Sequence, residues 1–94
     1  MFKPLDPLLH SELRLAVMSL LVSVSDAEFN YLKEETNSTA GNLSIQIQKL
    51  SEAGYIKVVK SFRNNYPLTT CSITAKGAKA FEKYVEALNA YIKK

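Results

Sequence analysis

The sequence of 94 residues has little of what membrane, secreted or disulfide-linked proteins need. Its single cysteine, Cys71, cannot form an internal disulfide, which favours a reducing compartment. Its apolar runs are a few residues long, far below the ~20 residues of a membrane-spanning helix. The first residues contain no apolar stretch of the secretory kind. From these absences we expect a cytoplasmic protein that does not enter a membrane.

Residues that perform catalysis or bind metal are also scarce. His10 is the one histidine, and no cysteine or second histidine lies at metal-ligand spacing from it. The sequence has no glycine-rich phosphate loop, and its carboxylates are scattered as helix-surface charges. We therefore expect no enzymatic activity, no cofactor and no metal site. His10 is interpreted as a residue at the start of a helix, and Cys71 as a small buried residue on a strand.

What the sequence does contain is one domain of ordinary composition with an uneven charge distribution. Apolar residues make up 47% and charged residues 22%, which is typical of a globular protein, and 94 residues suffice for one core spanning 1–94. Residues 1–47 hold three Lys/Arg and six Asp/Glu, whereas residues 48–94 hold nine and three. This asymmetry predicts one basic surface, which would suit a nucleic acid.

Apolar spacing and capping residues predict three helices in the first half. Residues 11–23 carry an apolar face so broad that it should be buried on more than one side. A short helix over 26–35 would be capped by Ser25 or Asp26. A third helix follows Ser38 and Thr39, places Leu43, Ile47 and Leu50 on one stripe, and ends at Gly54.

The second half predicts a hairpin and a long helix. Residues 55–62 and 68–74 have strand composition, with a turn at 63–67 between them. Thr74 would cap a helix over 75–92, whose apolar residues recur at spacings of three and four. This seam exceeds what the core of one copy needs, so we expect it to pair with a second copy. The alternative is packing on the helix at 11–23 of the same copy.

Together these elements predict an α+β, mainly α, winged helix-turn-helix. The helix-turn-helix would cover about 26–54, the two-stranded wing about 55–74, and the C-terminal dimerisation helix about 75–92. Residues 6–15, 41–44, 50–56 and 69–77 resemble the matching segments of MarR-like and ArsR-like transcription regulators. The resemblance covers nearly the whole chain and is to the minimal subfamily without a separate effector domain.

This resemblance implies sequence-specific binding of double-stranded DNA as a homodimer, usually as a repressor at a pseudo-palindromic operator. Helix 39–53 would enter the major groove, and the wing at 60–67 would contact the backbone or minor groove. The positions that match the family's DNA contacts are Ser38 and Thr39 at the helix start, Asn42, Ser44, Ile45, Gln48 and Lys49 toward the bases, and Lys60, Arg63, Asn64 and Asn65 on the wing.

Two positions depart from the family pattern. Ile45 stands where relatives often have Arg or His, so its contact would be apolar, such as a thymine methyl group. The wing tip reads Tyr66-Pro67-Leu68, where relatives often flank the proline with arginines, so this wing should hold the minor groove less strongly.

The expected dimer contacts come from the first and last helices. They are Leu13, Val17, Phe81, Tyr84, Val85, Leu88, Tyr91 and Ile92. Two rival functions stay open at this stage. The winged helix could dock another protein without reading DNA, or a small-molecule effector could bind a cleft between 11–23 and 75–92, although no residue identifies that ligand. Another possibility is that the cations of the wing do not contact DNA and only protect an edge strand from unwanted pairing.

Overall fold

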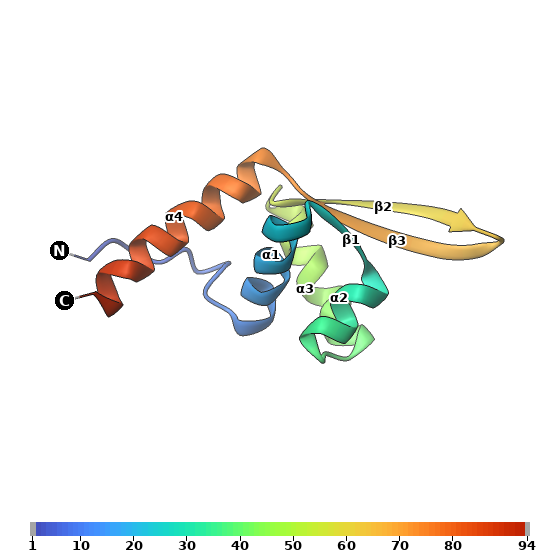
Figure 1. Cartoon of the computed structure of the whole chain (residues 1–94), viewed down its shortest axis with the longest axis horizontal. Helices are drawn as coiled ribbons and strands as arrows, with labels where there is room; N and C mark the ends of the chain where they lie inside the picture. The colour runs from blue at the N-terminus through green and yellow to red at the C-terminus, as the bar shows by residue number, and fades with distance from the viewer. Residues whose placement is uncertain (1, 94) are drawn as a thin grey trace.

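Four helices and a three-stranded antiparallel sheet are formed by residues 2–93, which the computed structural model describes. Along the chain they are α1 (Glu12–Val24), β1 (Asp26–Glu28), α2 (Phe29–Thr36), α3 (Ala40–Glu52), β2 (Ile56–Arg63), β3 (Tyr66–Ile73) and α4 (Ala75–Ile92) (Figure 1). This is a winged helix-turn-helix, as the sequence predicts. Within residues 2–93, no helix is both long and apolar enough to cross a membrane.

The strand β1 corrects the predicted helix over 26–35. Residues 26–28 pair with the central strand β3, with Ala27 opposite Cys71, and α2 begins only at Phe29. Both paired residues are buried, so sheet pairing and burial outweigh the capping signal of this segment. Ser25, with φ 71°, turns the chain out of α1, and its carbonyl accepts a hydrogen bond from the Ile73 amide. Neither Ser25 nor Asp26 caps α2.

The core is centred on α1, which confirms that its broad apolar face is buried on several sides. Its neighbours are α2, α3, α4 and the sheet. All seven elements and the N-terminal arm (residues 2–10) contribute buried residues to this core. The fully buried side chains are Leu9, Val17, Met18, Leu21, Leu32, Leu43, Leu50 and Cys71.

The bounds of α3 and α4 follow from local capping. The hydroxyl of Thr39 accepts a hydrogen bond from the Asn42 amide (3.2 Å), and the hydroxyl of Thr74 accepts one from the Gly77 amide (3.0 Å). Gly54, with φ 80°, adopts the left-handed conformation just beyond α3. Ser11 stands at the start of α1 but makes no side-chain capping bond.

The wing is longer and its turn tighter than the sequence indicates. Strands β2 and β3 pair from Ile56 opposite Ile73 to Arg63 opposite Tyr66. Asn64 and Asn65 alone make the turn, with φ 51° and 69°, which asparagine tolerates better than most residues. Because β1 pairs only with residues 70–72, the hairpin tip extends beyond the body of the molecule (Figure 1).

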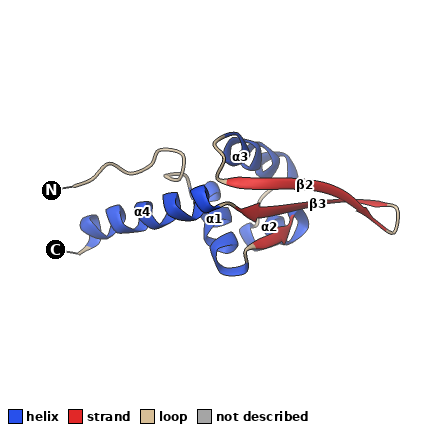
Figure 2. Cartoon of the chain, turned by 90° about the horizontal axis from the view of Figure 1, so that it is seen from above, coloured by secondary structure: helices blue, strands red, loops and turns tan. Residues whose placement is uncertain are grey.

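Helix α4 extends from the body in the opposite direction to the wing, with the N-terminal arm beside it (Figure 2). The molecule measures 53 × 25 × 21 Å, and its radius of gyration is 14.1 Å. A compact chain of this length has a radius of gyration of about 12 Å. The excess reflects these two projections, which extend beyond the packed core.

Candidate nucleic-acid interface

Helix α3 buries one stripe and exposes the other face to solvent. Leu43, Ile47 and Leu50 are buried against the core. All five residues expected to face the bases are exposed, and they are Asn42, Ser44, Ile45, Gln48 and Lys49. Ile45 is 54% exposed in the middle of this polar face. The outer face of α3 thus offers amides, a hydroxyl, a cation and one apolar side chain.

The two hydroxyls before α3 form hydrogen bonds within the chain. Thr39 caps the helix, and Ser38 is half-buried with its hydroxyl 2.8 Å from that of Thr36. Asn37, with φ 52°, ends α2 and gives the turn between the two helices. Because Thr39 only accepts in this cap, its O–H can still donate to a phosphate, and the expected phosphate contacts of Ser38 and Thr39 stay predictions.

Side-chain hydrogen bonds order the outer face of α3. The Gln48 amide donates to the Glu52 carboxylate (3.3 Å), and the Gln46 amide donates to Asn42 Oδ1 (3.0 Å). Arg14 of α1 in turn donates to Gln46 Oε1. The sequence reasoning missed Arg14, Gln46 and Glu52. Spacing of four residues on one helix could have found the two pairs within α3, but no local signal brings Arg14 to them.

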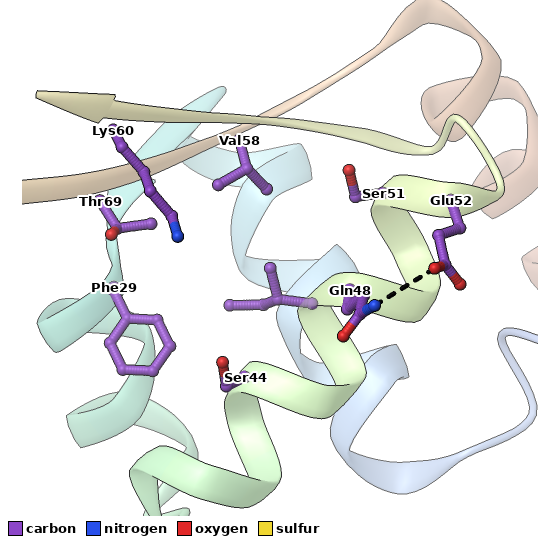
Figure 3. Close-up of a pocket in the computed structure, with 9 residues that line it drawn as sticks. Phe29, Ser44, Gln48, Ser51, Glu52, Val58, Lys60 and Thr69 are labelled. Atoms are coloured by element: carbon purple, nitrogen blue, oxygen red, sulfur yellow. Dashed lines mark hydrogen bonds between the residues drawn. The ribbon is translucent and has the colours of Figure 1, made fainter.

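A cleft of about 420 Å³ separates α3 from the root of the wing (Figure 3). Ser44 and Gln48 line it from α3, and Lys60 and Thr69 line it from β2 and β3. Phe29, Ser51, Glu52 and Val58, none of them expected at the site, complete its walls along with Ile47. The fold therefore brings part of the expected helix set and one expected wing residue to the same hollow.

The wing carries its expected polar residues on an exposed hairpin. Lys60, Asn64 and Asn65 are exposed. Arg63 forms a salt bridge to Glu28 of β1 (3.1 Å), with both side chains solvent-accessible. Exposed pairs of this kind contribute little stability, so Arg63 can exchange Glu28 for another anion at small cost. At the tip, Phe62 and Tyr66 are 78% and 75% exposed.

The basic residues of the second half lie on several elements, and the expected single basic surface stays a prediction. Lys49, Lys60 and Arg63 lie on α3 and the wing. Lys76, Lys79 and Lys83 line a second cleft, of about 540 Å³, between α4 and the N-terminal arm. In that cleft a hydrogen bond to Asp6, together with burial and the charge of that carboxylate, raises the pKa of Tyr55 to about 12.

The residues expected at a dimer interface divide by burial. Val17 and Tyr84 are buried in the core of one copy, so they present no surface to a second copy. Leu13, Phe81 and Leu88 are half-buried against that core. Val85, Tyr91 and Ile92 are exposed on α4, by 38%, 41% and 69%.

The tyrosines of α4 contact the N-terminal arm, which the sequence reasoning did not foresee. The Tyr84 hydroxyl is hydrogen-bonded to His10 Nδ1 (2.8 Å). Tyr91 stacks on Phe2, with ring centroids 4.6 Å apart, and donates to the Lys3 carbonyl. These contacts fix the arm along α4 within a single copy.

Cys71 is buried, as expected, and burial raises the pKa of its thiol to about 11. Within residues 2–93, no three His, Cys, Asp or Glu side chains gather as a metal site would require.

Comparison with known proteins gives consistent results. The family model described as winged helix DNA-binding domain matches residues 13–92. An uncharacterised protein of Methanocaldococcus jannaschii is 40% identical over 76 residues, which is 81% of this chain and 83% of that protein.

Two solved structures show the same fold. A transcriptional regulator homologue of Pyrococcus horikoshii superposes with a TM-score of 0.85 at 28% identity, over 90% of this chain and 84% of that one. The transcriptional regulator BldR of Sulfolobus solfataricus gives 0.74 at 18% identity, over 87% of this chain and 58% of that one. Because BldR is only 18% identical, its likeness to this chain concerns the fold alone.

Proposed function

Because the chain belongs to the family of winged helix DNA-binding domains, we propose that it is a homodimeric repressor that binds double-stranded DNA at a specific sequence. The observation that carries this proposal is the exposed outer face of α3 beside a protruding wing. An α-helix with its side chains is about 10–12 Å wide, which matches the ~12 Å major groove. Amide, hydroxyl and ammonium groups are the ones that read base edges there.

The wing supplies the phosphate contacts in this proposal. Lys60 and Arg63 would neutralise backbone charge, and the turn amides of Asn64 and Asn65 would donate to phosphate oxygens. Because cations on DNA are displaced by such contacts, affinity should fall as salt rises. Exposed Phe62 and Tyr66 place an apolar surface at the tip.

The dimer would form through α4. Its exposed residues Val85, Tyr91 and Ile92 continue the half-buried seam of Phe81 and Leu88. A two-fold axis across α4 would present two copies of α3 to one face of the DNA. Successive major grooves on that face lie ~34 Å apart, so the operator should be a pseudo-palindrome with half-sites about 10 base pairs apart.

The dimer is tested with Val85→Glu, because Val85 is exposed and its replacement leaves the core intact. Light scattering at tens of micromolar should give a dimer for the wild type and a monomer for the variant. A wild-type monomer, or a variant with unchanged mass, would contradict an interface through α4. The melting temperature of the variant checks its fold. It should stay close to that of the wild type at a concentration low enough to make the wild type monomeric.

DNA reading is tested by fluorescence anisotropy with matched variants. Lys49→Ala and Lys79→Ala each remove one positive charge, from α3 and from α4 respectively. A lost base or phosphate contact in each protomer should weaken operator binding at least roughly tenfold for Lys49→Ala, with little change for Lys79→Ala. Equal losses for the two variants would indicate attraction by net charge alone and contradict reading by α3.

Repression would follow if the bound dimer covers promoter DNA and excludes the polymerase. Transcription in vitro from a template that carries the operator across the promoter should decrease as protein is added. A template with a scrambled operator is the control. Increased transcription from the operator template would contradict repression.

A second candidate function is docking of another protein, which the apolar side chains on this surface favour. Ile45 lies exposed on α3, and Phe62 and Tyr66 lie exposed at the wing tip. The variant Gln48→Ala separates the two functions, because it removes a base-reading amide and leaves these three side chains in place. Weaker operator binding supports the regulator, whereas loss of a bound protein without any change in DNA affinity supports docking.

A further inference from the structure

A line of hydrogen bonds connects the N-terminal arm to the outer face of α3. Arg14 Nε donates to the Leu8 carbonyl (2.6 Å), and its terminal nitrogen donates to Gln46 Oε1. Gln46 Nε2 then donates to Asn42 Oδ1 (3.0 Å). Arg14 and Gln46 are half-buried, and Asn42 is exposed. We call Arg14, Gln46 and Asn42 the amide relay.

The chemistry of arginine fixes the direction of every bond in the relay. A guanidinium group has five N–H donors, no acceptor, and a positive charge at all ordinary pH values. The Gln46 amide must therefore turn its oxygen toward Arg14, which leaves its amino group for Asn42. Asn42 must then turn its own oxygen toward Gln46. The amino group of Asn42 is the part of the amide left to point away from the relay.

The arm holds the other end of the relay in place. The Leu8 amide donates to Asp6 Oδ1 (2.9 Å), and the Tyr55 hydroxyl donates to Asp6 Oδ2 (2.6 Å). The amides of Leu9 and His10 donate to the Asp6 carbonyl. These bonds form one turn in the arm and fix the Leu8 carbonyl that Arg14 contacts.

We propose that Arg14 is a positioning residue that, through Gln46, commits Asn42 to act as a hydrogen-bond donor toward DNA. The inference rests on the proposed function and extends it to base choice. A free asparagine can present either its oxygen or its amino group to a base edge. Held by the relay, Asn42 should select a base with a major-groove acceptor, such as guanine or thymine. It should reject cytosine, which offers only a donor at that edge.

The sharpest test reverses the orientation of the Asn42 amide and keeps the hydrogen bond from Arg14. In Gln46→Glu the new carboxylate still accepts from Arg14, but it cannot donate to Asn42. Asn42 should then turn its amino group inward and present its oxygen to the base. In Asn42→Asp the relay keeps its direction, and the outward atom is again an acceptor. Two substitutions at different positions should therefore converge on the same new base.

Selection of bound sequences from a random DNA pool measures this for the wild type and both variants. At one position in each half-site, the wild type should prefer guanine or thymine. Both variants should prefer cytosine there, because its only polar group in the major groove is a donor, with a reversal of roughly tenfold or more in relative affinity. Preferences at the other positions should stay as in the wild type. Lys33→Gln, which makes the same change of charge on the exposed face of α2, should leave every preference unchanged.

The results that would overturn the relay differ from those that would overturn the proposed function. A wild-type sequence preference that Gln46→Glu only weakens, with no change of base, would overturn the relay. A wild-type pool without any enriched sequence would overturn the proposed function and the reading role together. The NMR signals of the Asn42 side-chain amide, recorded without DNA, give a further readout, because Arg14→Ala should shift them although Arg14 does not contact Asn42. Unshifted signals would also overturn the relay.

Discussion

Gly77 provides the strongest prediction about the fold, because its neighbourhood has no room for a side chain. It lies in the first turn of α4, where a Cβ atom would stand 2.0 Å from the Tyr55 carbonyl oxygen and 2.8 Å from the carbonyl carbon. Ordinary van der Waals contacts of a Cβ begin near 3.4 Å. Gly77→Ala must therefore move the start of α4 away from the backbone that connects α3 to β2.

The cost of that movement can be estimated from what it disturbs. Thr74 donates from its amide to the Tyr55 carbonyl (3.1 Å) and from its hydroxyl to the Gly54 carbonyl (2.6 Å). Overpacking costs about 1–3 kcal/mol, and a lost hydrogen bond costs about 1 kcal/mol. We expect Gly77→Ala to lower the free energy of unfolding by about 3 kcal/mol, which corresponds to a melting temperature lower by roughly 12–24 °C.

Gly41 is the matched control, since it also lies in the first turn of a helix. A Cβ atom there meets nothing within 4 Å. Gly41→Ala should raise the free energy of unfolding by about 0.5–1 kcal/mol, because alanine favours the helix over the unfolded chain. Urea unfolding of both variants measures the two values. A loss below about 1 kcal/mol for Gly77→Ala, or equal values for the two variants, would refute the close packing of α4 on Tyr55.

Three further predictions concern Gly54, Cys71 and Arg63. Gly54→Ala should lower the free energy of unfolding by about 1–2 kcal/mol because φ is 80°, and Gly54→Asn should lower it less; equal losses in urea would contradict this. The pKa of the Cys71 thiol is raised from 9.0 to about 11, so the unfolded chain loses its proton first as pH rises. The stability of the wild type relative to Cys71→Ala should be constant below pH 9 and fall by ~1.4 kcal/mol per pH unit up to pH 11, whereas a flat difference would argue against a buried thiol. Arg63→Ala should make the dependence of log K on log salt shallower by ~1.8 for a dimer, and an unchanged slope would mean that Arg63 stays on Glu28.

The sequence predicted the parts of the fold that local residues determine. Helix α4 runs from Ala75 to Ile92 as expected, because Thr74 caps it and its apolar spacing is regular. Helix α3 is likewise bounded by Thr39 and by Gly54 in the left-handed conformation. Caps and periodicity act within a few residues, so one sequence suffices to find them.

What the sequence could not predict depends on contacts between distant segments. Strand β1 has three residues and no periodicity of its own, and it exists because it pairs with β3, more than 40 residues later. The contacts of Tyr84 with His10 and of Arg14 with Gln46 likewise join segments that no local pattern relates. For that reason the polar face of α3 was predicted, and the relay behind it was not.

Selection of bound DNA from a random pool is the decisive measurement for sequence-specific binding by two copies of α3. Two copies of α3 should select an inverted repeat with half-site centres about 10 base pairs apart, bound with one dimer per site and released by salt. Enrichment should be lost when Gln48 and Lys49 are both replaced by alanine. A pool without an enriched sequence, or a motif of one half-site that the double replacement leaves unchanged, would contradict such binding.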